Sequence, residues 1–155
     1  MRETLFNWLG QDLAGRSTLD LYAGTGALTF EAQSRGAVVS VAVDRNPVLV
    51  RSLREAARTI GFDGVEAHVD DALRFLEREA RRFDVVFLDP PFADDPWQAL
   101  FARLPDRLAP GGCVYAEAAH ELALPSGWEA LRHERAGAVH YHLIALEPLP
   151  PRAPP

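Results

Sequence analysis

The chain has 155 residues, of which 48% are hydrophobic and 25% are charged, and its formal net charge is −6. One globular domain with a single core accounts for this size and composition. The negative charge excludes a general electrostatic attraction to nucleic acid, so any contact with RNA must be local. The single cysteine, Cys113, excludes an internal disulfide, and the sequence shows neither a secretory signal nor an apolar run of roughly 20 residues. We therefore expect a soluble protein of the cytoplasm.

The predicted elements alternate between strands and helices. An amphipathic helix is expected at residues 4–9. Strand-like apolar runs follow at residues 17–22, 38–43, 64–69, 83–88 and 113–116, and helical patterns lie between them at 27–35, 47–60, 72–80 and 96–108. This alternation predicts an α/β protein with a mostly parallel sheet and helices on both faces.

The C-terminal part has a different pattern. Residues 128–134 and 139–146 are predicted to be extended and joined by a turn at 135–138, which gives an antiparallel hairpin at one edge of the sheet. Residues 148–155 are rich in proline and are expected to be extended or disordered. The sequence thus predicts a single domain over residues 1–147.

A glycine-containing loop follows the first predicted strand. Gly24 and Gly26 lie within the segment 20–28, and a helix is predicted directly after them. Glycines let the backbone turn tightly and approach a ligand, with helix N–H groups behind it. A nucleotide-type cofactor is the functional interpretation, and a plain turn is the alternative. A dinucleotide is disfavoured, because its fingerprint needs a small residue where this chain has Thr29.

Two carboxylates are predicted at the same edge of the sheet. Asp44 ends the second strand, where it could accept hydrogen bonds from both hydroxyls of a ribose. Asp71 follows the third strand, within reach of an adenine amino group. Each has a structural alternative, since Asp44 is also an acid ahead of the helix that begins near Pro47, and Asp71 could cap the helix at 72–80.

The most specific motif is Asp89-Pro90-Pro91-Phe92, directly after the fourth strand. Two prolines stiffen the chain there, although a simple strand-terminating turn is the alternative. An exocyclic amine on a base is a poor nucleophile, because its lone pair is delocalised into the ring. Asp89 and the Pro90 carbonyl can each accept one N–H of such an amine and aim its lone pair at a methyl sulfonium. Phe92 can stack on the extruded base.

These segments, together with Arg-Glu-Thr-Leu-Phe-Asn-Trp-Leu at residues 2–9, Asp71-Ala72 and Arg135-Ala136-Gly137, resemble the bacterial 16S rRNA guanine-N2 methyltransferase family. The resemblance implies a Rossmann-like class I methyltransferase fold with seven strands and S-adenosylmethionine as cofactor. It also implies a guanine amine of 16S rRNA as acceptor, in a partly assembled small ribosomal subunit. We expect a monomer that contacts no membrane and needs no metal. Members usually carry an arginine-rich segment before the first helix, where this chain has Met1.

The resemblance assigns roles to individual residues. The implied catalytic residues are Asp89, Pro90, Pro91 and Phe92, and the implied cofactor-binding residues are Asp20, Tyr22, Ala23, Gly24, Gly26, Asp44, Arg45, Asp71 and Ala72. Gly24 and Gly26 would line the methionine end of the cofactor. Asp44 would contact the ribose and Asp71 the adenine, and Asp20 would shape the loop.

Other functions are compatible with the same motifs. The chemistry of Asp89 to Phe92 does not identify the amine, so adenine N6 or a glutamine side chain is an alternative acceptor. A non-catalytic S-adenosylmethionine-binding module for ribosome assembly is an alternative from another class. A nicotinamide oxidoreductase is disfavoured by Thr29 and by the lack of a hydride-transfer partner.

A few charged residues outside these motifs remain. Arg51, Arg54 and Arg58 share one helix face, which could meet phosphate or simply be solvated. His140 and His142 share one face of a strand but have no third ligand at a supporting spacing, so no metal site is expected. Glu117 and His120 follow the fifth strand near the expected active edge, where either could touch substrate.

Overall fold

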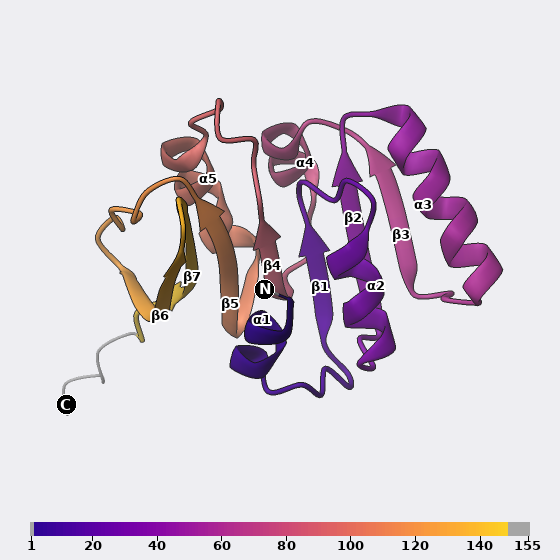
Figure 1. The fold of residues 1–155 in the computed structure, drawn as a ribbon, viewed down its shortest axis with the longest axis horizontal. Helices are drawn as coiled ribbons and strands as arrows, with labels where there is room; N and C mark the ends of the chain where they lie inside the picture. Colours follow the sequence, from indigo (N-terminus) through magenta and orange to yellow (C-terminus); the bar gives the residue numbers. More distant parts are fainter. Residues whose placement is uncertain (1, 149–155) are drawn as a thin grey trace, which may run out of the picture.

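The computed structural model describes residues 2–148, which form one sheet with helices on both faces (Figure 1). The strands are β1 Ser17–Asp20, β2 Val39–Asp44, β3 Val65–Val69, β4 Phe83–Leu88, β5 Leu108–Ala118, β6 Trp128–Ala136 and β7 Val139–Leu146. The helices are α1 Arg2–Leu9, α2 Ala27–Ser34, α3 Pro47–Ile60, α4 Ala72–Arg78 and α5 Trp97–Arg103. Every predicted element is present. The proline-rich segment lies, apart from Pro148, outside the described residues.

Two elements differ in extent from the prediction, and both differences have local causes. The helix expected at 96–108 is α-helical only to Arg103 and continues as a 3-10 helix over Leu104–Arg107, because Pro105 has no N–H to donate to a carbonyl four residues back. The fifth strand begins at Leu108 rather than at residue 113. Its pairing with β4 shifts in register over Pro110-Gly111-Gly112, a sequence that resembles a turn.

The strand order in the sheet is β3-β2-β1-β4-β5-β7-β6. The first five strands of this order run parallel, while β7 pairs antiparallel with β5 and with β6. The expected hairpin at the edge of the sheet is therefore confirmed, and β1 and β4 are neighbours in the sheet. The chain order reverses between β1 and β4, and open α/β sheets bind ligands outside the carboxyl ends of strands at such a point.

The two faces of the sheet are covered by different helices. Alternate residues of the inner strands, such as Val41 and Val86, pack with α4 and α5 in the largest apolar cluster. The intervening residues face the other way, where Phe87 packs with α1 and α2 and Ala42 packs with α3. Helices thus cover both faces of the sheet, as predicted.

The turn from β1 into α2 depends on a glycine. Gly26 is the N-cap of α2 and has a φ of 87°, in the left-handed region that favours glycine. A Cβ at this position would lie 2.8 Å from Leu53 Cδ1 and 3.0 Å from Phe30 Cε2. The absent side chain therefore lets the loop pack directly against α3.

We expect Gly26→Ala to lower the free energy of unfolding by about 3 kcal/mol, because backbone strain adds to overpacking. Gly24→Ala is the matched control. Gly24 also has a positive φ, of 56°, but a Cβ there would meet nothing within 4 Å, so about 1 kcal/mol is expected. Denaturant unfolding of both variants measures the difference. Equal losses would show that the contact with Leu53 carries no cost.

Candidate cofactor and substrate site

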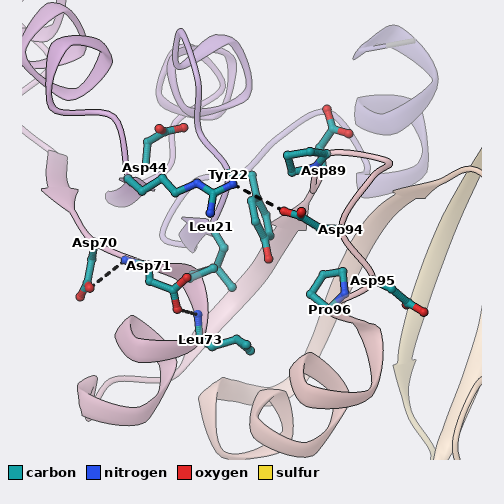
Figure 2. Close-up of a pocket in the computed structure, with 13 residues that line it drawn as sticks. Leu21, Tyr22, Asp44, Asp70, Asp71, Leu73, Asp89, Asp94, Asp95 and Pro96 are labelled. Atoms are coloured by element: carbon teal, nitrogen blue, oxygen red, sulfur yellow. Dashed lines mark hydrogen bonds and ion pairs between the residues drawn. The ribbon is translucent and has the colours of Figure 1, made fainter.

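The carboxyl ends of the parallel strands border a cavity of about 530 Å³, which is the size of a small-molecule site (Figure 2). Seven residues of the predicted site line it: Tyr22, Asp44, Arg45, Asp71, Ala72, Asp89 and Pro91. Six further lining residues were not singled out from the sequence: Leu21, Asp70, Leu73, Asp94, Asp95 and Pro96. In Figure 2, Asp71 and Asp89 lie on opposite sides of the cavity, with Tyr22 between them.

The other predicted residues of the glycine loop do not line this cavity but flank the lining residue Tyr22 in the chain. They are Asp20, Ala23, Gly24 and Gly26. Asp20 is buried at the end of β1, and its Oδ1 accepts a hydrogen bond from the Tyr22 backbone N–H at 3.2 Å. Burial raises the pKa of Asp20 to about 7, and the nearby charges of Asp89 and Asp44 act in the same direction. The Asp20 carboxyl, whose ionisation is unfavourable in this buried position, thus supports the start of the loop through its bond to Tyr22.

Asp44 joins the ends of β1 and β2. Its Oδ2 accepts a hydrogen bond from the Gly24 N–H at 2.9 Å, and its Oδ1 accepts one from the Asn46 N–H at 2.9 Å. The N-cap of α3 is Asn46, whose side chain accepts from the Val48 N–H. Asp44 therefore fixes the glycine loop beside the cavity, a role that its sequence context did not reveal.

Asp71 caps α4. Its Oδ2 accepts hydrogen bonds from the N–H groups of Leu73 and Arg74, both at 3.1 Å. The structural alternative for this residue is thus realised, and its contact with an adenine stays a prediction. The mouth of the cavity is crossed by an exposed ion pair between Arg45 and Asp94, whose N and O atoms are 3.6 Å apart.

The cavity is strongly acidic. Six carboxylates line it, those of Asp44, Asp70, Asp71, Asp89, Asp94 and Asp95, and Arg45 is the only basic lining residue. Such a lining attracts a cationic ligand and repels phosphate. The electrostatics therefore argue against a pyrophosphate-containing dinucleotide, in agreement with the argument from Thr29.

Asp89-Pro90-Pro91-Phe92 separates this cavity from a second one of about 180 Å³. Pro90 and Phe92 line the second cavity, and Pro91 lines both. Burial raises the pKa of Asp89. Burial also raises the pKa of Glu117 on β5, which lies close enough for the charge of Asp89 to raise it further. The Phe92 side chain is 55% exposed, so its ring is free to contact a ligand.

The other charged residues noted in the sequence lie elsewhere. Arg54 on α3 donates to the Ala67 carbonyl of β3, so it does not present a free guanidinium beside Arg51 and Arg58. His142 is buried, and its ring nitrogens contact the Leu122 N–H and the Ala116 carbonyl. Within residues 2–148, no group of three or more His, Cys, Asp or Glu side chains could hold a metal ion. The helices of this part of the chain include none that is long and apolar enough to span a membrane.

The fold and its site define a class I methyltransferase. The solved structure of the yhhF protein from Escherichia coli superposes with a TM-score of 0.88 at 32% identity, over 94% of this chain and 84% of yhhF. The same fold at 15% identity occurs in SMU.776, which is complexed with SAH, with a TM-score of 0.76 over 92% of this chain and 48% of that one.

The chain belongs to the family described as Conserved hypothetical protein 95, which matches residues 1–145. It is 32% identical to ribosomal RNA small subunit methyltransferase D of Escherichia coli over 152 residues, which are 95% of this chain and 77% of that protein. The Haemophilus influenzae protein of the same name is also 32% identical, over 92% of this chain and 78% of its own length. The expected family, fold and enzyme class, an S-adenosylmethionine-dependent rRNA methyltransferase, are confirmed at the level of the family.

We expect Asp20→Asn to stabilise the protein increasingly as the pH rises. The folded state keeps the proton of Asp20 up to a pH of about 7, whereas the unfolded chain loses it near the ordinary aspartate pKa of 3.8. The stability of the wild type therefore decreases as the pH rises from the lower of these values to the higher. An asparagine avoids this decrease, and its Oδ1 can still accept the hydrogen bond from the Tyr22 N–H.

The stability difference between Asp20→Asn and wild type should grow by on the order of 2 kcal/mol from about pH 4.5 to about pH 7.5. Denaturant unfolding across this range measures it. Asp63 is exposed on the turn before β3, so Asp63→Asn is the control for the same substitution outside the core. A constant difference for Asp20→Asn would contradict the proposed cost of ionisation.

Proposed function

We propose that this protein transfers a methyl group from S-adenosylmethionine to the N2 amine of a guanine in 16S rRNA. The observation that supports this most directly is the junction of the two cavities. An acidic, nucleoside-sized cavity and a smaller one share the Asp89-Pro90-Pro91-Phe92 loop as a wall. A donor on one side and a base on the other would meet at Asp89.

The acidic cavity suits the charge of the cofactor. S-adenosylmethionine carries a sulfonium and an ammonium group but no phosphate, and when bound it supplies an electrophilic methyl group. Its net positive charge is favoured by six lining carboxylates.

The positions of individual residues in the first cavity support specific roles in cofactor binding. Asp44 lies at the end of β2, where it can accept from ribose hydroxyls while Gly24 remains bound to its Oδ2. Asp71 and Ala72 begin α4 on the other side of the cavity, where a carboxylate oxygen and a backbone N–H can contact the adenine edge. Tyr22 and Arg45 line the same cavity.

The catalytic loop acts on the acceptor amine. Asp89 and the Pro90 carbonyl each accept one N–H of the amine, which localises the lone pair on nitrogen. The exposed ring of Phe92 stacks on the base. A new N–C bond forms as the C–S bond breaks, and the surplus proton leaves the nitrogen for the Asp89 carboxylate or for water. Burial keeps the pKa of Asp89 above its usual range, which favours its acceptance of that proton.

The acceptor RNA is inferred from the relatives. Proteins named ribosomal RNA small subunit methyltransferase D match nearly the whole chain. We therefore propose a small-subunit rRNA substrate, presented by a partly assembled subunit, for a monomer that acts in the cytoplasm. Because the net charge is −6, the RNA contact must be local.

The experiment that tests this function is transfer of a tritiated methyl group from S-adenosylmethionine to small ribosomal subunits that lack the modification. Nucleoside analysis of the digested RNA identifies the product. Label in N2-methylguanosine supports the proposal, while label in N6-methyladenosine or in a protein glutamine would assign another acceptor. Cofactor binding by calorimetry without any label would favour a binding module.

We expect Asp89→Ala to lower the rate of methyl transfer by roughly a thousandfold or more, because the amine loses an acceptor at the reacting nitrogen. The dissociation constant for S-adenosylmethionine should change by less than about fivefold, since the carboxylate is required for the acceptor. Single-turnover transfer and calorimetry measure the two effects. Asp63→Asn, far from the cavity, is the control. A fall in cofactor affinity that accounts for the whole loss of rate would contradict the role of Asp89.

A further inference from the structure

The second cavity has features that the transfer step alone does not explain. Its walls are the Pro90–Phe92 segment, the buried ring of Trp97, and the end of β5 with the residues that follow it, Glu117 and His120 among them. Pro91, Asp94 and Asp95 line both cavities, so the two spaces adjoin across one loop. A base held against Phe92 would therefore have its reacting edge at this boundary.

Glu117 is placed at the same boundary by the register of the sheet. Leu88 of β4 pairs with Ala116 of β5, so Asp89 and Glu117 are the next residues along two neighbouring parallel strands. Asp89 lines the first cavity and Glu117 lines the second, so the two carboxyl groups lie on either side of the boundary between them. Glu117 also pairs across the sheet with Tyr141. The register of these strands thus places the Glu117 carboxyl beside that of the catalytic aspartate.

Two adjacent, half-buried carboxylates repel each other. The repulsion is relieved when the two groups share a proton or accept hydrogen bonds from other donors. Burial and the charge of Asp89 raise the pKa of Glu117 to about 7. Near neutral pH the pair can therefore release its shared proton when a ligand supplies donors instead. The ligand that fits best offers two neighbouring N–H groups.

Among the bases with an exocyclic amine, guanine alone offers such a pair, N1–H next to its N2 amine. In adenine and cytosine, the ring nitrogen beside the amine is an acceptor. Its lone pair would face the Glu117 carboxylate, and two acceptors repel each other. A flipped base is read through this edge, and a mismatch that leaves a buried polar group unpaired is strongly rejected.

We propose that Glu117 accepts the N1–H of the acceptor base while Asp89 accepts from its amine, so that Glu117 selects guanine. The inference rests on the proposed methyl transfer, to which it adds no step. In this proposal, Glu117 on β5 determines the specificity for the base, whereas the Asp89 loop carries out the reaction.

The test replaces the accepted guanine of the RNA by 2-aminopurine, which keeps the C2 amine but carries a lone pair in place of N1–H. The wild-type enzyme should methylate guanine at least about a hundredfold faster. Glu117→Gln should reduce this preference by about tenfold or more, because its amide N–H can donate to N1 of 2-aminopurine. Calorimetry with S-adenosylmethionine confirms that the variant is folded.

Glu134→Gln is the matched control, since Glu134 is an exposed acid on the neighbouring strand β6 that also pairs with Tyr141. It should keep the wild-type preference. If Glu117→Gln slows both bases equally, Glu117 does not read the base, and the proposed methyl transfer stands without it. If the wild-type enzyme methylates no guanine, the proposed function itself is overturned, and the inference falls with it.

Discussion

The parallel pairing of β1 with β4 is the constraint on which the rest of this structure depends. Because the chain order reverses at this pair, the glycine loop after β1 and the Asp89 loop after β4 leave the sheet side by side. β2 and β3 then extend the sheet on one side and bring Asp44 and Asp71 to the same edge. The proposed donor and acceptor sites adjoin there because of this strand order.

Acidic side chains gathered at one sheet edge are costly, and the structure offsets this cost in several ways. Asp44 accepts from two backbone N–H groups, and Asp71 accepts from two at the start of a helix. For Asp20 and Glu117, hydrogen bonds do not offset the cost of burying a charge. Burial therefore raises the pKa of each to about 7. The proposed ligands, a cationic donor and an acceptor with two N–H groups, would relieve the remaining repulsion, which links the electrostatic cost in the free protein to binding.

The two sides of the Asp89 loop differ in character. The side toward β2 and β3 is lined by carboxylates, which suits the proposed cationic donor. The side toward β5 is lined by Phe92 and Trp97, which suits the proposed planar base. Two successive prolines keep the loop between them stiff.

Much of this arrangement followed from the sequence itself. The alternation of apolar runs determined the strands and helices, because the periodicity of burial is a local property, and the motifs at strand ends identified Asp44, Asp71 and Asp89. The length of β5 was not predictable in this way, since Pro110-Gly111-Gly112 forms a bulge only against β4. Register and strand order likewise decided which side chains meet. The bond from Gly24 to Asp44, the acids at 94 and 95 in the cavity wall, and the proximity of Asp89 to Glu117 all join segments whose separation along the chain says nothing of their distance in space. The tertiary structure alone brings them together, because hydrogen bonds between distant strands set positions that no local pattern records.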